Sequence, residues 1–68
     1  MNKIEMYKKR IESDRQSFTA YIKKHGYVEN LGHIEQREFS DKVFSDSELD
    51  YSEQAGLSMD YVEMLNNL

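Results

Sequence analysis

The feature that most constrains this chain is the spacing of apolar side chains in its first 25 residues. Side chains of one series recur every three or four positions, at Ile4, Tyr7, Ile11, Phe18 and Tyr21, with the polar Asp14 as a further member. This spacing keeps them on one stripe of an α-helix. The run ends at Lys23, Lys24 and His25, whose cationic side chains suit a helix C-terminus, and Gly26 follows. The sequence therefore predicts one long helix over residues 3–25.

Glycines divide the rest of the chain, because it contains no Pro and only three Gly. Residues 26–32 begin and end with Gly and are expected to form a short link. In residues 33–44, Phe39 and Val43 are four positions apart and share a helical face, whereas Ile34 lies to one side. We expect a second helix over this range, since a lone strand would lack a partner for its backbone.

Ser45 and Glu48 mark the predicted start of a third helix. They form the Ser-x-x-Glu pattern of a capping box, in which each side chain bonds the backbone of the other residue. This helix is expected to continue to Ala55 and to end at Gly56, because Gly favours helix ends.

A last helix is predicted to begin at Ser58, which can cap its first turn. Leu57, just before this cap, and Val62 are spaced to pack together as a hydrophobic staple. The buried stripe of this helix is expected to comprise Tyr61, Val62, Leu65 and Leu68. The sequence thus predicts a single all-α domain over residues 1–68. It is expected to be a small bundle of three to four helices with a long N-terminal helix and a helix-turn-helix-like C-terminal pair.

The core of this domain must be thin, because only 15 of the 68 residues are Leu, Ile, Val or Phe. A chain of this length buries only about 60% of the surface that its unfolded form exposes. It has no Cys, so neither a disulfide nor a thiolate metal site can stabilise the fold. Oligomerisation and partner binding are the remaining ways to stabilise so small a core. The stripe of Ile4, Ile11 and Phe18 is the candidate surface for a homodimer.

Charge is divided unevenly along the chain. Residues 1–28 contain seven Lys or Arg and three Asp or Glu, which gives a net charge of +4. Residues 29–68 contain two Lys or Arg and ten Asp or Glu, which gives a net charge of −8. One interpretation is that the acidic helices fold back on the basic helix, whose cations flank its apolar stripe. These cations are Lys3, Lys8, Arg10, Arg15 and Lys24. The excess negative charge would then face solvent or a basic groove of a partner, and in the extreme imitate a nucleic-acid backbone.

The segment Ala55-Gly56-Leu57-Ser58, with Val62 and Leu65 after it, resembles the helix-turn-helix of small repressor-type DNA-binding domains. In that unit Gly permits the turn, and the later apolar residues hold the two helices together. The resemblance implies a DNA-binding regulator that uses Ser58, Asn67 and the basic first helix. The helix that would enter the groove nevertheless contains two acids and no Lys or Arg, whereas groove entry requires cations that offset phosphate charge.

The segment Asp46-Ser47-Glu48-Leu49-Asp50 is similar to the Ser-x-Glu-Leu-Asp stretch of small helical-hairpin phosphatases that act on response regulators. This similarity implies a role for Asp50, although Asp46 stands where that family has Ser. No nucleophile turn, catalytic triad or Gly-rich phosphate loop occurs in the sequence. His25 and His33 are too far apart to place two metal ligands on one helix face. We therefore expect no enzymatic activity, no metal and no cofactor.

The sequence favours a small non-enzymatic regulator or inhibitor that binds another protein through an acidic helical surface. The residues expected to contact the partner are Asp46, Glu48, Asp50, Glu53, Asp60 and Glu63. The alternative is the helix-turn-helix DNA-binding regulator, with nucleic acid as the less favoured partner. No apolar stretch is long enough to cross a membrane, and the first residues lack a secretory signal, so we expect a cytoplasmic protein.

Overall fold

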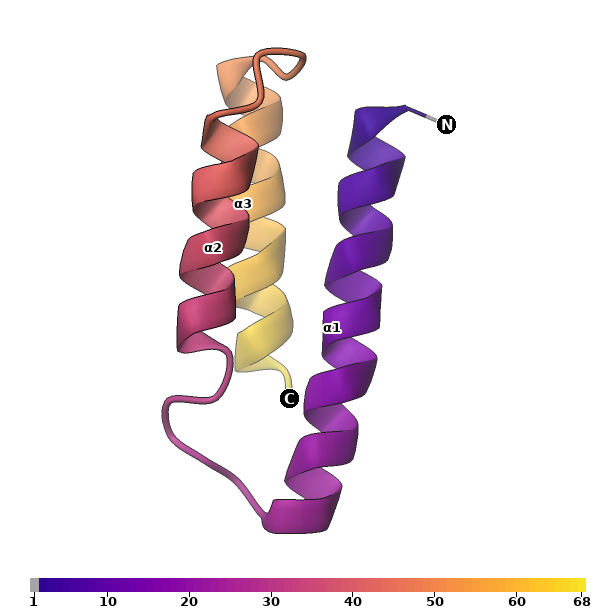
Figure 1. Ribbon diagram of the computed structural model, residues 1–68, viewed down its shortest axis with the longest axis vertical. Coiled ribbons are helices and arrows are strands. Elements are labelled where there is room, and N and C mark those ends of the chain that lie inside the picture. The colour runs from indigo at the N-terminus through magenta and orange to yellow at the C-terminus, as the bar shows by residue number, and fades with distance from the viewer. Residues whose placement is uncertain (1) are drawn as a thin grey trace.

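The computed structural model describes residues 2–68, which form three α-helices in an up-and-down arrangement (Figure 1). The helices are α1 (Lys3–His25), α2 (His33–Phe44) and α3 (Tyr51–Asn66). Both α1 and α2 pack against α3, which runs in the same direction as α1 and opposite to α2. The described part of the chain is therefore all-helical, as the sequence predicts, with three helices.

Helix α1 begins and ends through the local signals visible in the sequence. The side chain of Asn2 accepts a hydrogen bond from the backbone N–H of Glu5 (2.8 Å) and caps the first turn. At the other end Gly26 has φ +79°, and its N–H donates to the carbonyl of Ile22 (2.7 Å). A positive φ is readily adopted only by Gly, so the chain turns away from the helix at this residue.

Helix α2 has the bounds expected from the sequence, but Ser45 closes it instead of opening the next helix. The Ser45 hydroxyl donates to the carbonyl oxygens of Asp41 (2.8 Å) and Lys42 (3.1 Å). These are carbonyls of the last turn, which have no partner within the helix. The prediction of a third helix starting at Ser45 is therefore wrong, because this hydroxyl is already used at the C-terminus of α2.

The capping box of the C-terminal region is formed by Asp50 and Glu53. The Asp50 carboxylate accepts from the backbone N–H of Glu53 (2.8 Å), and the Glu53 carboxylate accepts from the backbone N–H of Asp50 (3.0 Å). Helix α3 consequently starts at Tyr51, later than the sequence predicted.

Gly56 lies inside α3 and does not end a helix. Helix α3 is continuous from Tyr51 to Asn66, and among residues 2–68 only the other two glycines have positive φ. Ser58 is not an N-cap, since its hydroxyl shares a hydrogen bond of 2.7 Å with that of Ser40 on α2. The proposed staple is also wrong, because Leu57 is buried whereas Val62 is exposed. The structure therefore has no helix-turn-helix break at this position.

Replacing Gly56 by Ala tests this continuity. A Cβ added at Gly56 would meet nothing within 4 Å, and its backbone is helical. Because Ala is favoured over Gly inside helices by about 1 kcal/mol, we expect Gly56→Ala to raise the free energy of unfolding by roughly 0.5–1 kcal/mol. Urea unfolding followed by circular dichroism measures this change. A loss of stability would instead indicate a turn at Gly56.

The core lies between the three helices and is centred on aromatic rings. Its buried members are Tyr7, Phe18, Phe39, Val43, Leu49, Leu57, Tyr61 and Met64. The ring of Phe39 stacks on Tyr61 (centroids 4.6 Å apart) and meets the edge of Tyr7 (5.8 Å). These three rings come from three different helices, so they join all of them at one point.

The predicted apolar stripe of α1 is used within the chain. Phe18 belongs to the buried core, and Ile4 and Ile11 are partly buried against it. A homodimer through these three residues stays a prediction, and it would have to form where they already contact the chain's own core. Of the aromatic residues in this stripe, Tyr7 and Phe18 are buried, whereas Tyr21 is exposed.

Candidate protein-binding surface

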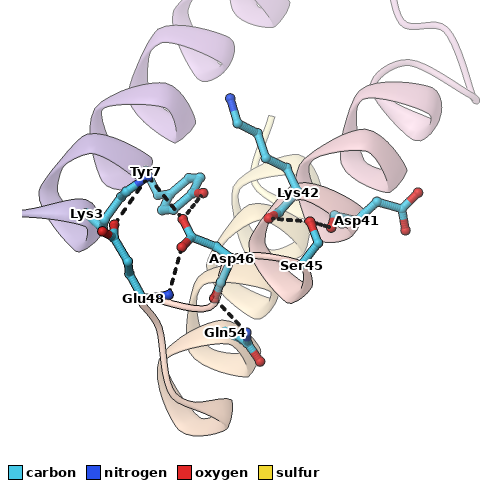
Figure 2. A network of polar contacts seen from close by, with 8 residues as sticks. All are labelled: Lys3, Tyr7, Asp41, Lys42, Ser45, Asp46, Glu48 and Gln54. Atoms are coloured by element: carbon cyan, nitrogen blue, oxygen red, sulfur yellow. Dashed lines mark hydrogen bonds and ion pairs between the residues drawn. The ribbon is translucent and has the colours of Figure 1, made fainter.

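Asp46, the first of the predicted partner-binding acids, lies in a network that ties the α2–α3 loop to α1 (Figure 2). The hydroxyl of Tyr7 donates to the Asp46 carboxylate (2.6 Å), and the Lys3 ammonium lies 3.3 Å from the same oxygen. The backbone N–H of Glu48 donates to the other carboxylate oxygen of Asp46 (3.0 Å), and the Gln54 side chain donates to the backbone carbonyl of Asp46 (3.1 Å). The Asp46 side chain is only 10% exposed, and its contacts join the α2–α3 loop to α1.

These bonds shift the protonation equilibria of both partners. The Tyr7 hydrogen bond, the Glu48 backbone N–H and Lys3 favour the ionised carboxylate, so they lower the pKa of Asp46. The pKa of Tyr7 is raised, first by burial of its hydroxyl and then by its bond to Asp46. At neutral pH the pair therefore consists of a carboxylate that accepts and a neutral phenol that donates.

The lowered pKa of Asp46 predicts that the free energy of unfolding decreases at acidic pH. The pKa of Asp46 is lower in the folded protein than in the unfolded chain, where Asp has a pKa of about 3.9. The ionised carboxylate therefore stabilises the folded protein at pH values above about 3.9. This stabilisation is lost as the pH falls through the folded pKa. We expect the free energy of unfolding to drop more steeply below about pH 4 in the wild type than in Asp46→Asn. Urea titrations from pH 6 to pH 2.5 measure the slope, and identical slopes would contradict this role.

A second contact between α1 and the rest of the molecule is formed by Asp14 and Tyr61. The hydroxyl of the fully buried Tyr61 donates to the Asp14 carboxylate, and the Arg10 guanidinium lies 3.1 Å from the same oxygen. Burial raises the pKa of Tyr61, and its bond to Asp14 raises it further. Asp14 is the one polar residue in the apolar series of α1, and this interruption is the signal in the sequence from which such a contact could have been inferred.

The predicted folding-back of acids onto the basic helix occurs at one cation. Within residues 2–68, Lys3 is the only Lys or Arg that forms an ion pair with another element, namely with Asp46 and Glu48. Arg10 and Arg15 instead pair with acids one turn away on α1 itself. Direct ion pairing between the first helix and the acids of the C-terminal half is thus limited to Lys3 in the described residues, although Lys8 lines a hollow together with Glu53 and Asp60.

The six predicted partner-binding acids fall into two groups. Asp46, Asp50 and Glu53 make the loop and capping bonds described above, and Glu48 is exposed but lies 3.5 Å from Lys3. Asp50, to which the phosphatase similarity implies a role, serves as the N-cap of α3. Asp60 and Glu63 are exposed on α3, and in the described chain their carboxylates make no hydrogen bond or ion pair of the kind seen at Asp46.

An apolar stripe on the outward face of α3 is the feature that sequence reasoning missed. It consists of Tyr51, Ala55, Met59 and Val62, which we call the α3 stripe. The spacings of four, four and three place these residues on one side of the helix. Tyr51 and Met59 are 76% and 72% exposed, and Val62 is 40% exposed. The sequence placed Val62 in the core because helical periodicity alone does not show which of two apolar faces of a helix is covered.

The two ends of the α3 stripe differ in shape. At the N-terminal end the ring of Tyr51 lies beside that of Phe44 from α2, with centroids 6.3 Å apart. At the other end Val62 lines a hollow of ≈ 270 Å³ between the α1–α2 link, α2 and α3. The lining residues are Tyr27, Glu29, Leu31, His33, Gln36, Val62, Leu65 and Asn66. The stripe therefore runs from an aromatic pair to a concave end.

Among residues 2–68, no three His, Asp or Glu side chains gather closely enough to hold a metal ion. No helix in this part of the chain is long and apolar enough to span a bilayer. No protein-family model matches the chain, and it shows no significant similarity to any curated protein or solved structure with which it was compared.

Proposed function

We propose that this protein is a non-enzymatic regulator or inhibitor that acts by binding another protein through the exposed surface of α3, which carries the α3 stripe and, on other sides of the helix, the acids Asp60 and Glu63. The observation that carries the proposal is the coincidence of two features on one element. The α3 stripe presents exposed apolar side chains, and the segment that contains it is uniformly acidic. Apolar side chains in contiguous exposed positions are typical of interaction sites in small proteins.

The acidity of this segment is continuous along the sequence. Residues 43–68 contain six Asp or Glu and no Lys, Arg or His. Asp60 and Glu63 are exposed on α3 and make no ion pair of the kind that holds Asp46, and Asp60 lines a hollow on the α1 side of α3 together with Lys8. A protein surface with apolar side chains flanked by Lys or Arg is complementary to it in both respects.

Nucleic acid is a poor ligand for the same face. Binding to a phosphate backbone requires cations, and α3 has none. The continuous helix through Gly56 also removes the turn on which the repressor-type resemblance rested. We expect no retardation of random duplex DNA by micromolar protein at low salt, and a clear salt-sensitive shift would favour the DNA-binding alternative.

Affinity capture from the native host, read out by mass spectrometry, tests the proposal. The test variant is Asp60→Lys with Glu63→Lys, because these acids lie on α3 outside the capping and loop bonds. Proteins captured by the wild type are expected to be reduced at least tenfold with this variant. Substitution of Glu53 is unsuitable, since it would remove the capping box.

The matched control carries the same change in net charge elsewhere. Glu5→Lys with Glu38→Lys reverses two exposed acids on α1 and α2 and leaves α3 intact. This control is expected to capture the same proteins as the wild type. Equal losses with both variants would show that overall charge matters and the α3 face does not, which would contradict the proposal. Circular dichroism of each variant verifies that it is folded.

A further inference from the structure

A hollow between α1 and α3 brings charges of both signs together around an apolar floor. Its volume is ≈ 180 Å³, and the residues that line it are Ile4, Lys8, Glu53, Gly56, Leu57 and Asp60. The cation comes from α1 and both acids come from α3. Within residues 2–68, neither Lys8 nor Asp60 forms an ion pair, and both are exposed. The charges of the hollow are therefore available to an occupant.

Gly56 leaves the middle of the hollow open. A Cβ added at this residue would meet nothing within 4 Å, although its backbone lies inside a continuous helix. A Gly at such a position allows the backbone of another molecule to approach closely. The buried Leu57 and the partly buried Ile4 supply apolar surface beside it. The hollow thus has room for an occupant as well as surface to contact it.

The hollow and the α3 stripe lie on different sides of α3. Gly56 and Asp60 each follow a member of the stripe, Ala55 and Met59, by one position. One position along an α-helix turns the side-chain direction by about 100°, because a turn contains about 3.6 residues. An occupant of the hollow therefore contacts a different side of the helix from an occupant of the stripe.

The parallel course of the two helices determines how a second copy would meet this hollow. Helices α1 and α3 run in the same direction and lie side by side (Figure 1). In a dimer with its two-fold axis along the helices, α1 of each copy lies against α3 of the other, as in any self-complementary interface. Lys8 of each copy then faces Glu53 and Asp60 of the other copy. An axis across the helices would instead bring Lys8 against Lys8, and like charges repel.

Charge also distinguishes a second copy from other occupants. A partner with only cations at its surface would meet Lys8, and a partner with only anions would meet Glu53 and Asp60. The chain itself carries both signs, on the two helices that the two-fold arrangement exchanges. A second copy consequently satisfies both walls of the hollow at once.

We propose that the occupant of the hollow is a second copy of this chain, in a dimer whose two-fold axis runs along α1 and α3. Lys8 of each copy pairs with the acids of the other, and the apolar floors face each other across Gly56. The dimer adds apolar burial to a chain whose length limits its core. Of the stripe predicted as a homodimer surface, Ile4 is the member that lines the hollow. The inference goes beyond the proposed function, because it concerns another side of α3.

Two charge-reversal variants test the dimer by complementation. Lys8→Glu and Asp60→Lys each replace both attractive pairs of the dimer by repulsive ones. Each variant alone is expected to raise the dimer dissociation constant at least about tenfold. In an equimolar mixture, the substituted position 8 of one variant faces the substituted position 60 of the other, and the two unchanged residues also pair. Sedimentation equilibrium is expected to show a mixed dimer with a dissociation constant within about threefold of the wild type.

The matched controls change the same charges outside the hollow. Lys9→Glu and Glu38→Lys alter exposed residues of α1 and α2, and each is expected to keep the dissociation constant within about twofold of the wild type. A wild type that is monomeric at millimolar concentration would overturn the inference. A mixture that associates no more than its separate components would also overturn it, because the pairs would then not form between copies. Circular dichroism verifies that every variant is folded.

The failure of this inference is distinguishable from the failure of the proposed function. Lys8→Glu removes the dimer contact without changing α3, so it separates the loss of the dimer from the loss of partner binding. A monomeric wild type that still captures another protein would overturn the dimer and leave the protein-binding proposal in place. A dimer that passes the complementation test but captures no other protein would support the dimer and contradict the proposed function.

Discussion

Phe39→Ala is expected to lower the free energy of unfolding by about 3–5 kcal/mol, the range measured for large aromatic truncations in protein cores. Phe39 is almost completely buried and lies between the rings of Tyr7 and Tyr61. Its removal would leave a cavity at the one point where the three helices meet. A loss of this size is a large fraction of the 5–15 kcal/mol that stabilises a typical domain.

The measurement is urea unfolding followed by circular dichroism at 222 nm. Phe44→Ala is the matched control, because it removes the same side chain from the same helix at an exposed position. We expect it to cost about 1 kcal/mol or less. If Phe39→Ala is unfolded at 25 °C, Phe39→Leu provides a measurable intermediate loss. Similar losses at Phe39 and Phe44 would contradict the placement of the core.

The second large effect is expected at Gly32, where the link enters α2. Gly32 has φ +80°, and an added Cβ would lie 2.5 Å from Leu65 Cδ2 and 3.3 Å from Phe18 Cε2. The left-handed backbone costs an L-residue about 1–2 kcal/mol, and overpacking adds a further 1–3 kcal/mol. We therefore expect Gly32→Ala to lower the free energy of unfolding by about 2–5 kcal/mol.

Gly26 supplies the comparison that isolates the packing contribution. Its φ is +79°, nearly that of Gly32, but an added Cβ there meets nothing within 4 Å. Gly26→Ala is expected to lose only the backbone contribution of about 1–2 kcal/mol. Chemical denaturation of both variants gives the difference between them. Equal losses would show that the link does not pack against α1 and α3 as the structure places it.

The sequence identified the parts of the fold whose signals are local. The bounds of α1 and α2 follow from apolar spacing and from Gly26 and Gly32, because a helix period and a residue with positive φ act within one or two turns. The same reasoning placed Phe39 and Val43 on the buried face of α2 and Ile34 outside it. No information about distant residues was needed.

The start and the continuity of α3 could not be predicted from local signals, because competing signals occur in the same segment. Both Ser45 with Glu48 and Asp50 with Glu53 match a capping-box pattern, and only the second pair forms one. A Gly in a helix costs about 1 kcal/mol, whereas burying a side chain such as Leu57 contributes about 1.5–3 kcal/mol. Packing of the continuous helix against α1 and α2 therefore outweighs the turn preference of Gly56.

The sequence by itself determined the all-helical class, the bounds of the first two helices and the strong acidity of residues 43–68, since these depend on composition and on neighbours within a few positions. Only the tertiary structure decided which acids are free. Asp46 is held by Tyr7, 39 positions away, whereas Asp60 and Glu63 stay exposed. It also decided that the second apolar side of α3 remains uncovered, because three helices leave one face of α3 without a neighbour. That face depends on which surfaces meet, a non-local property that helical periodicity does not contain.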